Sequence, residues 1–454
     1  MINKNDILEV RIEDVGTEGE GVAKVDGYTL FVKDAIAGDH ARIKVIKALK
    51  NYGYGRLEEI ISPSPFRVEA VCPAAKSCGG CQIQEMSYAA QLDFKRNKVE
   101  NNLIRIGKLA DVTVLPVIGM DEPFHYRNKA QFPVGLNKDG NIVMGFYAGR
   151  THNIIECDNC AIGLAVNSKI LNIIKEYMIN NHILPYNEAT GTGVVRHILI
   201  RAGFKSGEIM VSLIINDDKL PNTHQLVDEL LKIQGMTSIS YNINKERTNK
   251  ILGKDVINLY GEGYITDFIG DVKFKISPLS FYQVNPVQTE KLYGKALEFA
   301  ELTGNETVWD LYCGVGTISL FLAKKAKKVY GVEIISEAIN DACENARINS
   351  IKNSEFFVGK SEEVLPDFYK KYGEKADVIV VDPPRKGCDI NLLKTISDMA
   401  PDRLVYVSCD SATLARDLNY LTNNGFKVEK VQPVDMFPMS SHVETVCLLS
   451  RKEK

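Results

Sequence analysis

The sequence lacks any apolar run that approaches the roughly 18 residues needed by a membrane-spanning helix. Its opening residues, MINKNDILEV, mix charged and apolar side chains and lack the apolar segment typical of a signal peptide. We therefore expect a cytoplasmic protein with no membrane partner. Internal repeats and low-complexity tracts are also absent, and a hydrophobic fraction of 45% is ordinary for a globular protein.

A strong excess of positive charge is absent too, because the net charge is −3. Composition alone therefore does not indicate a nucleic-acid-binding protein. Residues 41–57 differ from the chain as a whole, because this stretch has no acidic residue and carries tyrosines among its basic residues. Basic groups neutralise phosphates and tyrosine rings stack on bases, although a solvated strand face explains the stretch equally well. Its candidate nucleic-acid contacts are Arg42, Lys44, Lys47 and Arg56.

The chain of 454 residues is too long for a single hydrophobic core, so roughly two to four domains are expected. Residues 1–61 contain short alternating runs separated by Gly or Asp, which predicts a small β-barrel of the oligonucleotide-binding type. Residues 62–265 form a less regular α+β part. In residues 266–454, apolar strands alternate with amphipathic helices. This pattern predicts a multidomain α/β protein with a C-terminal, Rossmann-like, doubly wound parallel sheet.

The segment DLYCGVGTISL, residues 310–320, follows a predicted strand and begins a helix. Gly314 and Gly316 in this turn allow backbone amides to approach a ligand closely. The next strand ends in Glu333, which is suitably placed to accept hydrogen bonds from ribose hydroxyls. The turn therefore indicates nucleoside binding, but a dinucleotide site would carry a third glycine where this chain has Ser319.

The segment VVDPPRKG, residues 380–387, decides between a dinucleotide site and a site for another kind of nucleoside ligand. An apolar strand ends in Asp382, and two prolines then force a rigid extended loop. This arrangement resembles the fourth motif of S-adenosylmethionine methyltransferases. Members that methylate exocyclic amines typically have an aromatic residue after the prolines, and Arg385 in that place disfavours an amine target.

Cys409 ends the apolar run LVYVSC, and a helix is predicted to begin directly after it. Asp410 or Ser411 can cap that helix, and a helix N-terminus stabilises a thiolate. A thiolate that adds to carbon 6 of a pyrimidine activates carbon 5 to accept a methyl group, and a base must then remove the carbon 5 proton. Glu444 is the candidate base, and His442 is the alternative.

Several motifs together resemble the RNA uracil-C5 methyltransferase family, which makes 5-methyluridine. They are SFYQVN (280–285), DLYCGVGTISL, GVE (331–333), DPPRKG, SC-x-x-ATLARDL and HVETV. The resemblance covers essentially the whole chain and is closest to the branch that acts on 23S ribosomal RNA, with an N-terminal TRAM domain and an iron–sulfur cluster. It implies that Cys409 is the nucleophile and Glu444 the base. It also implies that S-adenosylmethionine is bound by Gln283, Tyr312, Glu333 and Asp382.

The resemblance also implies four cluster ligands, which are Cys72, Cys78, Cys81 and Cys160. Four thiolates suit a [4Fe–4S] cluster or zinc, and the spacing does not choose between them. Cys157 is an alternative fourth ligand, although the family pattern around NCAIG favours Cys160. One departure from the family is Asp410-Ser411 in place of Asn-Pro after the nucleophile, and the extra carboxylate is expected to raise the pKa of the thiol.

The sequence therefore predicts a monomeric enzyme that flips a uridine out of folded 23S ribosomal RNA and methylates it. The barrel would grip the RNA, with Arg127 and Lys129 of HYRNKAQF near the same path. Two alternatives are the same chemistry on tRNA and a catalytically inactive RNA-binding ribosome-assembly factor. A cytosine-C5 enzyme is disfavoured, because that family places a cysteine where this chain has Arg385.

Overall fold

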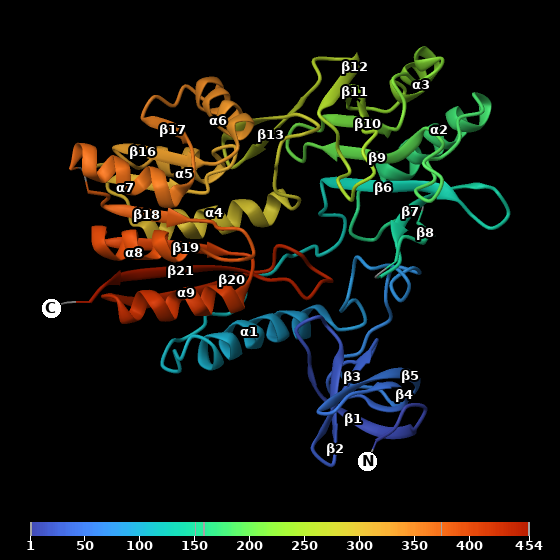
Figure 1. Ribbon diagram of the computed structural model, residues 1–454, viewed down its shortest axis with the longest axis horizontal. Coiled ribbons are helices and arrows are strands. Elements are labelled where there is room, and N and C mark those ends of the chain that lie inside the picture. The colour runs from blue at the N-terminus through green and yellow to red at the C-terminus, as the bar shows by residue number, and fades with distance from the viewer. Residues whose placement is uncertain (1, 150, 158, 374, 453–454) are drawn as a thin grey trace.

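The computed structural model describes residues 2–149, 151–157, 159–373 and 375–452. Its N-terminal part is a closed five-stranded barrel with the order β1-β2-β3-β5-β4, coloured blue in Figure 1. Side chains alternate between the barrel core and the surface, as at Val10 and Ile12 or Leu30 and Val32, which are buried. The predicted small barrel is confirmed. Its strands are β1 (Ile7–Val15), β2 (Gly21–Val25), β3 (Tyr28–Lys33), β4 (His40–Ala48) and β5 (Tyr52–Ser62).

The central part is built on a seven-stranded sheet with the order β12-β11-β10-β9-β6-β7-β8. Only β10 and β11 pair in parallel, and the remaining neighbours are antiparallel. Two helices, α2 (Val166–Asn180) and α3 (Thr223–Leu230), pack their apolar residues on this sheet. The strands are β6 (Lys129–Leu136), β7 (Ile142–Tyr147), β8 (Ile154–Glu156), β9 (Val195–Ala202), β10 (Ile209–Ile215), β11 (Met236–Ile243) and β12 (Asp255–Tyr260).

The C-terminal part is a second seven-stranded sheet, with the order β17-β16-β15-β18-β19-β21-β20. Successive residues of one strand, such as Val308 and Trp309, point to opposite faces and belong to two separate hydrophobic cores. Both faces of the sheet are therefore covered. The predicted doubly wound sheet is confirmed. The strands are β15 (Thr307–Leu311), β16 (Lys328–Glu333), β17 (Ser354–Val358), β18 (Val378–Val381), β19 (Arg403–Ser408), β20 (Phe426–Val434) and β21 (Glu444–Arg451).

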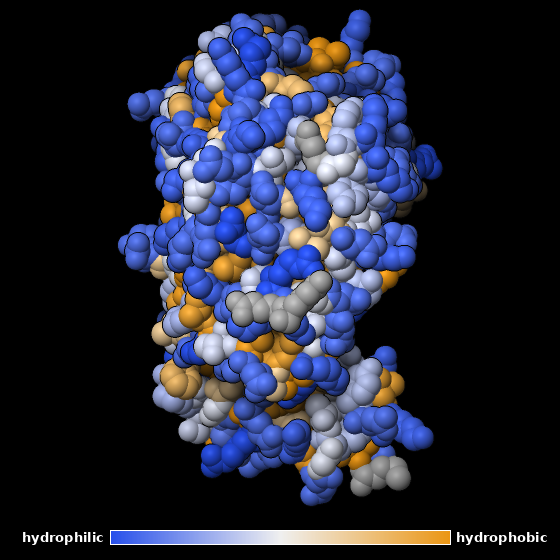
Figure 2. Space-filling model, turned by 90° about the vertical axis from the view of Figure 1, so that its left-hand side faces the viewer, coloured by the Kyte–Doolittle hydropathy of each residue, from blue (hydrophilic) through white to orange (hydrophobic). Residues whose placement is uncertain are grey.

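Helices cover both faces of this sheet. The face of the molecule seen in Figure 2 is mostly hydrophilic, with smaller hydrophobic areas between. The last two strands depart from the strand–helix alternation, because β21 pairs antiparallel with both β19 and β20. The helices are α4 (Pro286–Ala300), α5 (Thr317–Ala323), α6 (Ser336–Ile348), α7 (Ser361–Tyr372), α8 (Ile390–Met399) and α9 (Ser411–Asn423).

Helix α1 (Tyr88–Arg105) lies within the range assigned to the central part but packs against α9 and β20 of the C-terminal part. Its Val99 and Leu103 are buried in the same core as α9. The hairpin β13 (Ile265–Ile269) and β14 (Val272–Ile276) also packs on the C-terminal part, against α4 and α6. The C-terminal unit therefore includes a helix that comes much earlier in the chain.

Segment 435–443, which leads into β21, is held by residues from several parts of the chain. From α1, Lys95 Nζ lies 2.5 Å from Asp435 Oδ1, and both side chains are fully buried. From α4, Gln288 Nε2 donates to the Asp435 carbonyl. Tyr126 donates its hydroxyl to the Pro438 carbonyl. Within the described ranges, no helix is long and apolar enough to cross a membrane.

Candidate active site

The C-terminal ends of β15, β16 and β18 form a crevice, because β16 and β18 lie on opposite sides of β15 and the strand order reverses there. The turn after β15 has three left-handed residues, with φ of 68° at Tyr312, 55° at Gly314 and 79° at Gly316. A Cβ placed on Gly314 would meet no atom within 4 Å. The backbone of this turn therefore faces open space that a ligand can enter.

Glu333 lies beside this turn, at the end of β16. One carboxylate oxygen accepts from the Gly314 amide at 3.2 Å, and the other accepts from the Ile335 amide at 3.1 Å. Two exposed side chains follow, Ile334 at 59% and Ile335 at 55% exposure. They give an apolar surface next to the carboxylate, suited to a planar ring bound beside a sugar. Sequence reasoning found Glu333 but missed the isoleucines, whose only signal is two apolar residues directly after the strand.

Two carboxyl groups, Asp310 and Asp382, lie at the base of the crevice. Burial raises the pKa of each carboxyl to about 7, and the negative charge of Asp382 adds to the increase at Asp310. Asp310 accepts a hydrogen bond from the Ser319 hydroxyl through Oδ2, but its buried Oδ1 has no partner within the described residues. An unpaired buried acceptor and a cluster of carboxyls favour a ligand that brings positive charge and N–H donors.

Gln283 belongs to the same edge of the sheet. Its side chain bonds with the hydroxyl of Tyr293, which also lies 3.0 Å from the Thr317 hydroxyl at the start of α5. Asn285 caps α4 by accepting from the Gln288 amide, and Pro286 is the first helical residue. Asn285-Pro286 is a sequence signal for the start of a helix, and the structure confirms this start. The four residues predicted to contact the cofactor, Gln283, Tyr312, Glu333 and Asp382, lie at one edge of the sheet.

Cys409 and Glu444 lie opposite each other at this edge. Ser408 and Thr445 are paired residues of the antiparallel strands β19 and β21, so the residues next to them face each other where the pairing ends. Burial and the Asp382 charge raise the pKa of the Glu444 carboxyl to about 8, whereas Arg385 opposes this increase. A buried carboxyl beside a thiol is unusual on an apolar strand, and it can accept a proton from a substrate bound there.

The pKa of the Cys409 thiol corrects one expectation from the sequence. Burial raises it to about 12, with Glu444 and Asp382 adding to the increase and Arg385 opposing it. The expected stabilisation of the thiolate by α9 is wrong for the free protein, because the first amides of α9 are occupied. Asp410 Oδ1 accepts from the Ala412 and Thr413 amides at 2.9 and 3.0 Å.

Asp410 therefore serves as the cap of α9, one of the two possibilities left open by the sequence. Its carboxylate is directed to the helix amides, and the carboxyls that raise the pKa of the Cys409 thiol are Glu444 and Asp382. The other possible cap, Ser411, instead accepts a hydrogen bond from Asn102 of α1 at 2.8 Å. The departure from the family's Asn-Pro pair thus retains a capping group at the position after Cys409.

The loop that carries Arg385 is fixed to α9. The Cys388 amide donates to Asp417 Oδ2 at 2.9 Å, and Asp417 is almost fully buried. Gly387 has a φ of 77°, and a Cβ there would lie 2.6 Å from Asp417 Oδ2. Sequence reasoning missed Asp417, whose signal is an acidic residue on a helix face that is otherwise apolar. This packing holds the positive charge of Arg385 beside Cys409 and Glu444.

His442, the alternative base, lies on the same segment. Its pKa is lowered mainly by burial and then by Arg385 and Lys98. Its ring packs edge-on against Phe437, with 6.2 Å between ring centres. The electrostatic neighbours of the Cys409 thiol are Glu444, Asp382 and Arg385. The geometry therefore favours Glu444 over His442 as the group that acts together with the thiol.

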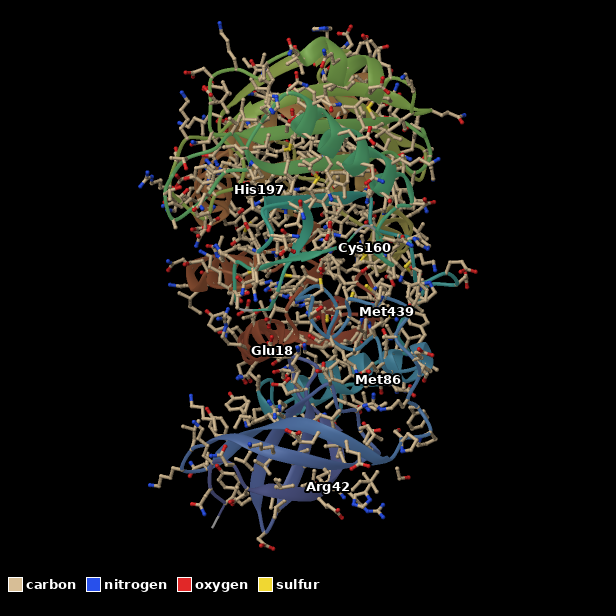
Figure 3. All side chains as sticks on the ribbon, turned by 90° about the vertical axis from the view of Figure 1, so that its right-hand side faces the viewer. Glu18, Arg42, Met86, Cys160, His197 and Met439 are labelled. Atoms are coloured by element: carbon tan, nitrogen blue, oxygen red, sulfur yellow. The ribbon has the colours of Figure 1, made fainter. Side chains whose placement is uncertain are left out.

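The predicted cluster ligands line one cavity of about 320 Å³ in the central part, and Figure 3 labels Cys160 there. Cys72, Cys78, Cys81 and Cys160 all contribute to its wall, and so does Cys157. The Cys157 thiol donates to Cys160, which lowers the pKa of Cys160 and raises that of Cys157. Within the described ranges, no three of these side chains adopt a geometry that could hold a metal ion.

Arg127 and Lys129 line the same cysteine cavity. Burial, together with Arg201 and Arg127, lowers the pKa of the Lys129 ammonium to about 8. The sequence led us to expect these two residues near the path of the RNA. The structure shows that they lie next to the cysteines. Their positive charges are suitably located to balance thiolates.

The barrel residues predicted to contact RNA differ in their partners. Arg42 forms ion pairs with Glu9 and Glu59, and Arg56 forms one with Glu58. Lys44 lies opposite Arg56, and Lys47 lies opposite Tyr54, on the paired strands β4 and β5. An aromatic cluster lies next to them.

That aromatic cluster consists of Phe31, Tyr52 and Tyr54, with ring centres 5.8 to 5.9 Å apart. Sequence reasoning found the tyrosines but missed Phe31, which only the pairing of β3 with β5 brings to them. The surface combines cations with stackable rings, as nucleic-acid-binding surfaces do.

The site thus has the parts of a class of enzymes that transfer a methyl group from a nucleoside cofactor. The sequence profile of the tRNA (Uracil-5-)-methyltransferase family matches residues 87–452, and that of the TRAM domain matches residues 3–57. The chain belongs to this family and is an RNA methyltransferase that acts at carbon 5 of uracil. S-Adenosylmethionine carries a positive sulfonium and an ammonium group, so the crevice with its unpaired Asp310 oxygen fits it.

Similar proteins agree with this assignment. The chain is 54% identical to an uncharacterized RNA methyltransferase of Halalkalibacterium halodurans, over 99% of this chain and 98% of the relative. It is 50% identical to another from Clostridium tetani, over 99% and 97%. The solved structure of a tRNA (uracil-54, C5)-methyltransferase from Pyrococcus abyssi, in complex with S-adenosyl-L-homocysteine, superimposes with a TM-score of 0.81. Its sequence identity is 27%, with coverage of 97% of this chain and 100% of that one.

Replacing Asp310 by Asn should stabilise the protein and weaken cofactor binding. The pKa of Asp310 in the folded state is about 7, above the unfolded value near 3.8, so ionisation costs stability as pH rises through this range. Asn cannot ionise, and we expect the free energy of unfolding at pH 7.5 to rise by about 4 kcal/mol. Urea unfolding measures this change, and calorimetry with S-adenosylhomocysteine measures the loss of affinity. Asp398→Asn, on the exposed side of α8, should change neither. A less stable Asp310→Asn protein with full affinity would contradict the prediction.

Proposed function

We propose that this enzyme methylates uridine through a covalent adduct between Cys409 and the base. The observation that carries the proposal is the placement of Cys409 opposite Glu444, with Arg385 beside both. Bound S-adenosylmethionine supplies the methyl group. Gln283, Tyr312, Glu333 and Asp382 hold it in the crevice at the ends of β15, β16 and β18.

Each step follows from the chemistry of these residues. Cys409 gives its proton to solvent, and its sulfur forms a bond to carbon 6 of the uracil while the double-bond electrons move to carbon 5. Carbon 5 would then take the methyl group of S-adenosylmethionine, whose sulfur would keep the electrons of the broken bond and leave as S-adenosylhomocysteine. Glu444, as a carboxylate, removes the proton from carbon 5, and these electrons re-form the double bond as the carbon 6–sulfur bond breaks. Arg385 favours the ionised forms of both residues, because it lowers both pKa values.

Substitutions at the two residues should separate these steps. Cys409→Ala should abolish methyl transfer from radiolabelled S-adenosylmethionine to unmodified RNA. Glu444→Gln should allow methyl transfer but block release, so a labelled protein–RNA adduct should persist in a denaturing gel. The control is Cys343→Ala, which removes an exposed thiol on α6 and should leave turnover intact. Full activity of Cys409→Ala, or fast release by Glu444→Gln, would exclude this mechanism.

We further propose that the substrate is 23S ribosomal RNA, bound across the barrel and the C-terminal part. A groove of about 760 Å³ between the barrel and α1 supports such a path. Phe31 lines it on the barrel side, and Asn102, which bonds with Ser411 two residues after Cys409, lines it on the α1 side. Arg42, Lys44, Lys47 and Arg56 would contact phosphates near the barrel. The Pyrococcus relative acts on tRNA, so tRNA is the second candidate.

Mapping of 5-methyluridine decides between the two RNAs. Nucleoside mass spectrometry of ribosomal and transfer RNA, from cells with and without this gene, should show one 23S position lose its methyl group. Purified enzyme should restore that position in the unmodified ribosomal RNA. Loss confined to tRNA would reject the ribosomal assignment and leave the covalent mechanism unaffected.

We also propose that the cysteine cavity holds a [4Fe–4S] cluster bound by Cys72, Cys78, Cys81 and Cys160. The shared cavity supports this, and Arg127 and Lys129 in its wall would offset the negative charge of four thiolates. Zinc is the alternative metal. The cluster would order the central part and would take no part in methyl transfer.

Metal analysis tests the cluster and its fourth ligand together. Protein purified without oxygen should contain about four irons and four sulfides per chain, as a [4Fe–4S] cluster requires. Cys160→Ala should lose most of this iron, whereas Cys157→Ala should keep it. The reverse pattern would make Cys157 the ligand, and stoichiometric zinc without sulfide would reject the cluster.

A further inference from the structure

A cavity of about 590 Å³ in the central part lies apart from the Cys409 site. It opens beside the end of β7 and the start of β9, and the turn before β9 closes one side. We call it the His152 cavity, after a ring in its wall. The side chains relevant here are Tyr147, His152, Tyr186, Glu188, Arg196 and His197.

Several side chains of this wall carry flat rings. The rings of Tyr147 and His152 are stacked, with centres 5.1 Å apart and planes inclined by 22°. His197 stands edge-on to Tyr147, at 82° and 6.3 Å. Such platforms bind planar ligands, and proteins that recognise single-stranded RNA hold unstacked bases in this way. The His152 side chain remains 62% exposed, so a ligand can reach this stack.

Two buried polar atoms in the wall lack a hydrogen-bond partner within the described part of the chain. They are Nδ1 of His197, which is 7% exposed, and Nε of Arg196, which is 6% exposed. Buried polar atoms are normally paired, so these two mark the wall as one whose hydrogen bonds the protein alone does not complete. Arg196 is itself held in place, because its Nη1 donates to the carbonyls of Asn244 and Glu246.

The charge of the wall indicates which part of a nucleotide it suits. Glu188 places its carboxylate against His152, with 2.6 Å between Oε2 and Nδ1, and Glu156 also lines the cavity. Carboxylates repel phosphates but accept hydrogen bonds from exocyclic amino groups of bases. A base edge is therefore favoured over the sugar–phosphate backbone, and an amino-bearing base is favoured over uracil.

We propose that the His152 cavity binds an unstacked adenine, guanine or cytosine of the RNA substrate, away from the target uridine. The proposal rests on the action of this chain on RNA. Tyr147 and His197 also line the cysteine cavity, so a base held here would lie against the other side of that wall. Figure 3 shows His197 and Cys160 in the central part and Met439 between them and the barrel.

Affinity for RNA tests the site. The probe is the unmodified transcript, ribosomal or transfer RNA, that the wild-type enzyme methylates. Loss of one stacked base from its aromatic platform should raise the Kd of His152→Ala by about tenfold, in a filter-binding assay. The kcat at saturating RNA and the affinity for S-adenosylhomocysteine should stay near wild type. His152→Phe, which keeps a flat ring, should retain most of the RNA affinity.

An abasic scan identifies the base. Removing one purine or cytosine outside the target should weaken binding by the wild type about tenfold and should weaken His152→Ala no further. An unchanged Kd of His152→Ala would overturn the proposal. The proposal would also be overturned if free AMP, GMP or CMP bound in the cavity while His152→Ala left the Kd for RNA unchanged. These results do not depend on the adduct assay with Glu444→Gln, so this site and the covalent mechanism can fail separately.

Discussion

The buried ion pair between Lys95 and Asp435 is the contact on which the assembly of this enzyme depends. Both side chains are fully buried, and removing one partner from such a pair costs about 3–5 kcal/mol because the other charge is left alone. Tyr88 donates to Asp435, and Lys95 also donates to the Phe437 carbonyl, so both charges have further partners. Such a pair adds little net stability, but it tolerates only one arrangement of α1 against the segment before β21.

That segment carries the constraint to the active site. Asn285, the cap of α4, and Gln288 in α4 donate to the Met436 and Asp435 carbonyls. The Gln82 and Ile83 amides donate to the Met439 carbonyl. Residues from the linker after the barrel, from α1 and from α4 thus converge on the few residues that precede Glu444. The carboxyl that faces Cys409 is therefore positioned by the docking of the separate parts of the chain.

Local patterns in the sequence were sufficient for the barrel, the parallel sheet, the glycine turn and the Asn285 cap, because each depends on residues close together in the chain. They also indicated a helix near residues 87–107, but they did not show where α1 packs, because its buried stripe includes Gln91 and Lys95. A buried lysine looks exposed until its partner, 340 residues away, is known. The sequence led us to expect a raised pKa of the Cys409 thiol, but from Asp410. The actual causes are burial and the carboxyls of Glu444 and Asp382, which are distant in the chain.

The carboxyls near Cys409 keep its side chain in the thiol form in the free protein. Burial, Glu444 and Asp382 raise the pKa of Cys409 to about 12, so the free protein holds it as a thiol, which reacts slowly with oxidants and electrophiles. A cation bound in the crevice would favour the ionised forms of Asp382, Glu444 and Cys409 together. The same carboxyls that suppress the thiolate in the empty crevice therefore make its formation sensitive to a positively charged ligand. Under the proposed mechanism, nucleophile activation is coupled to cofactor binding.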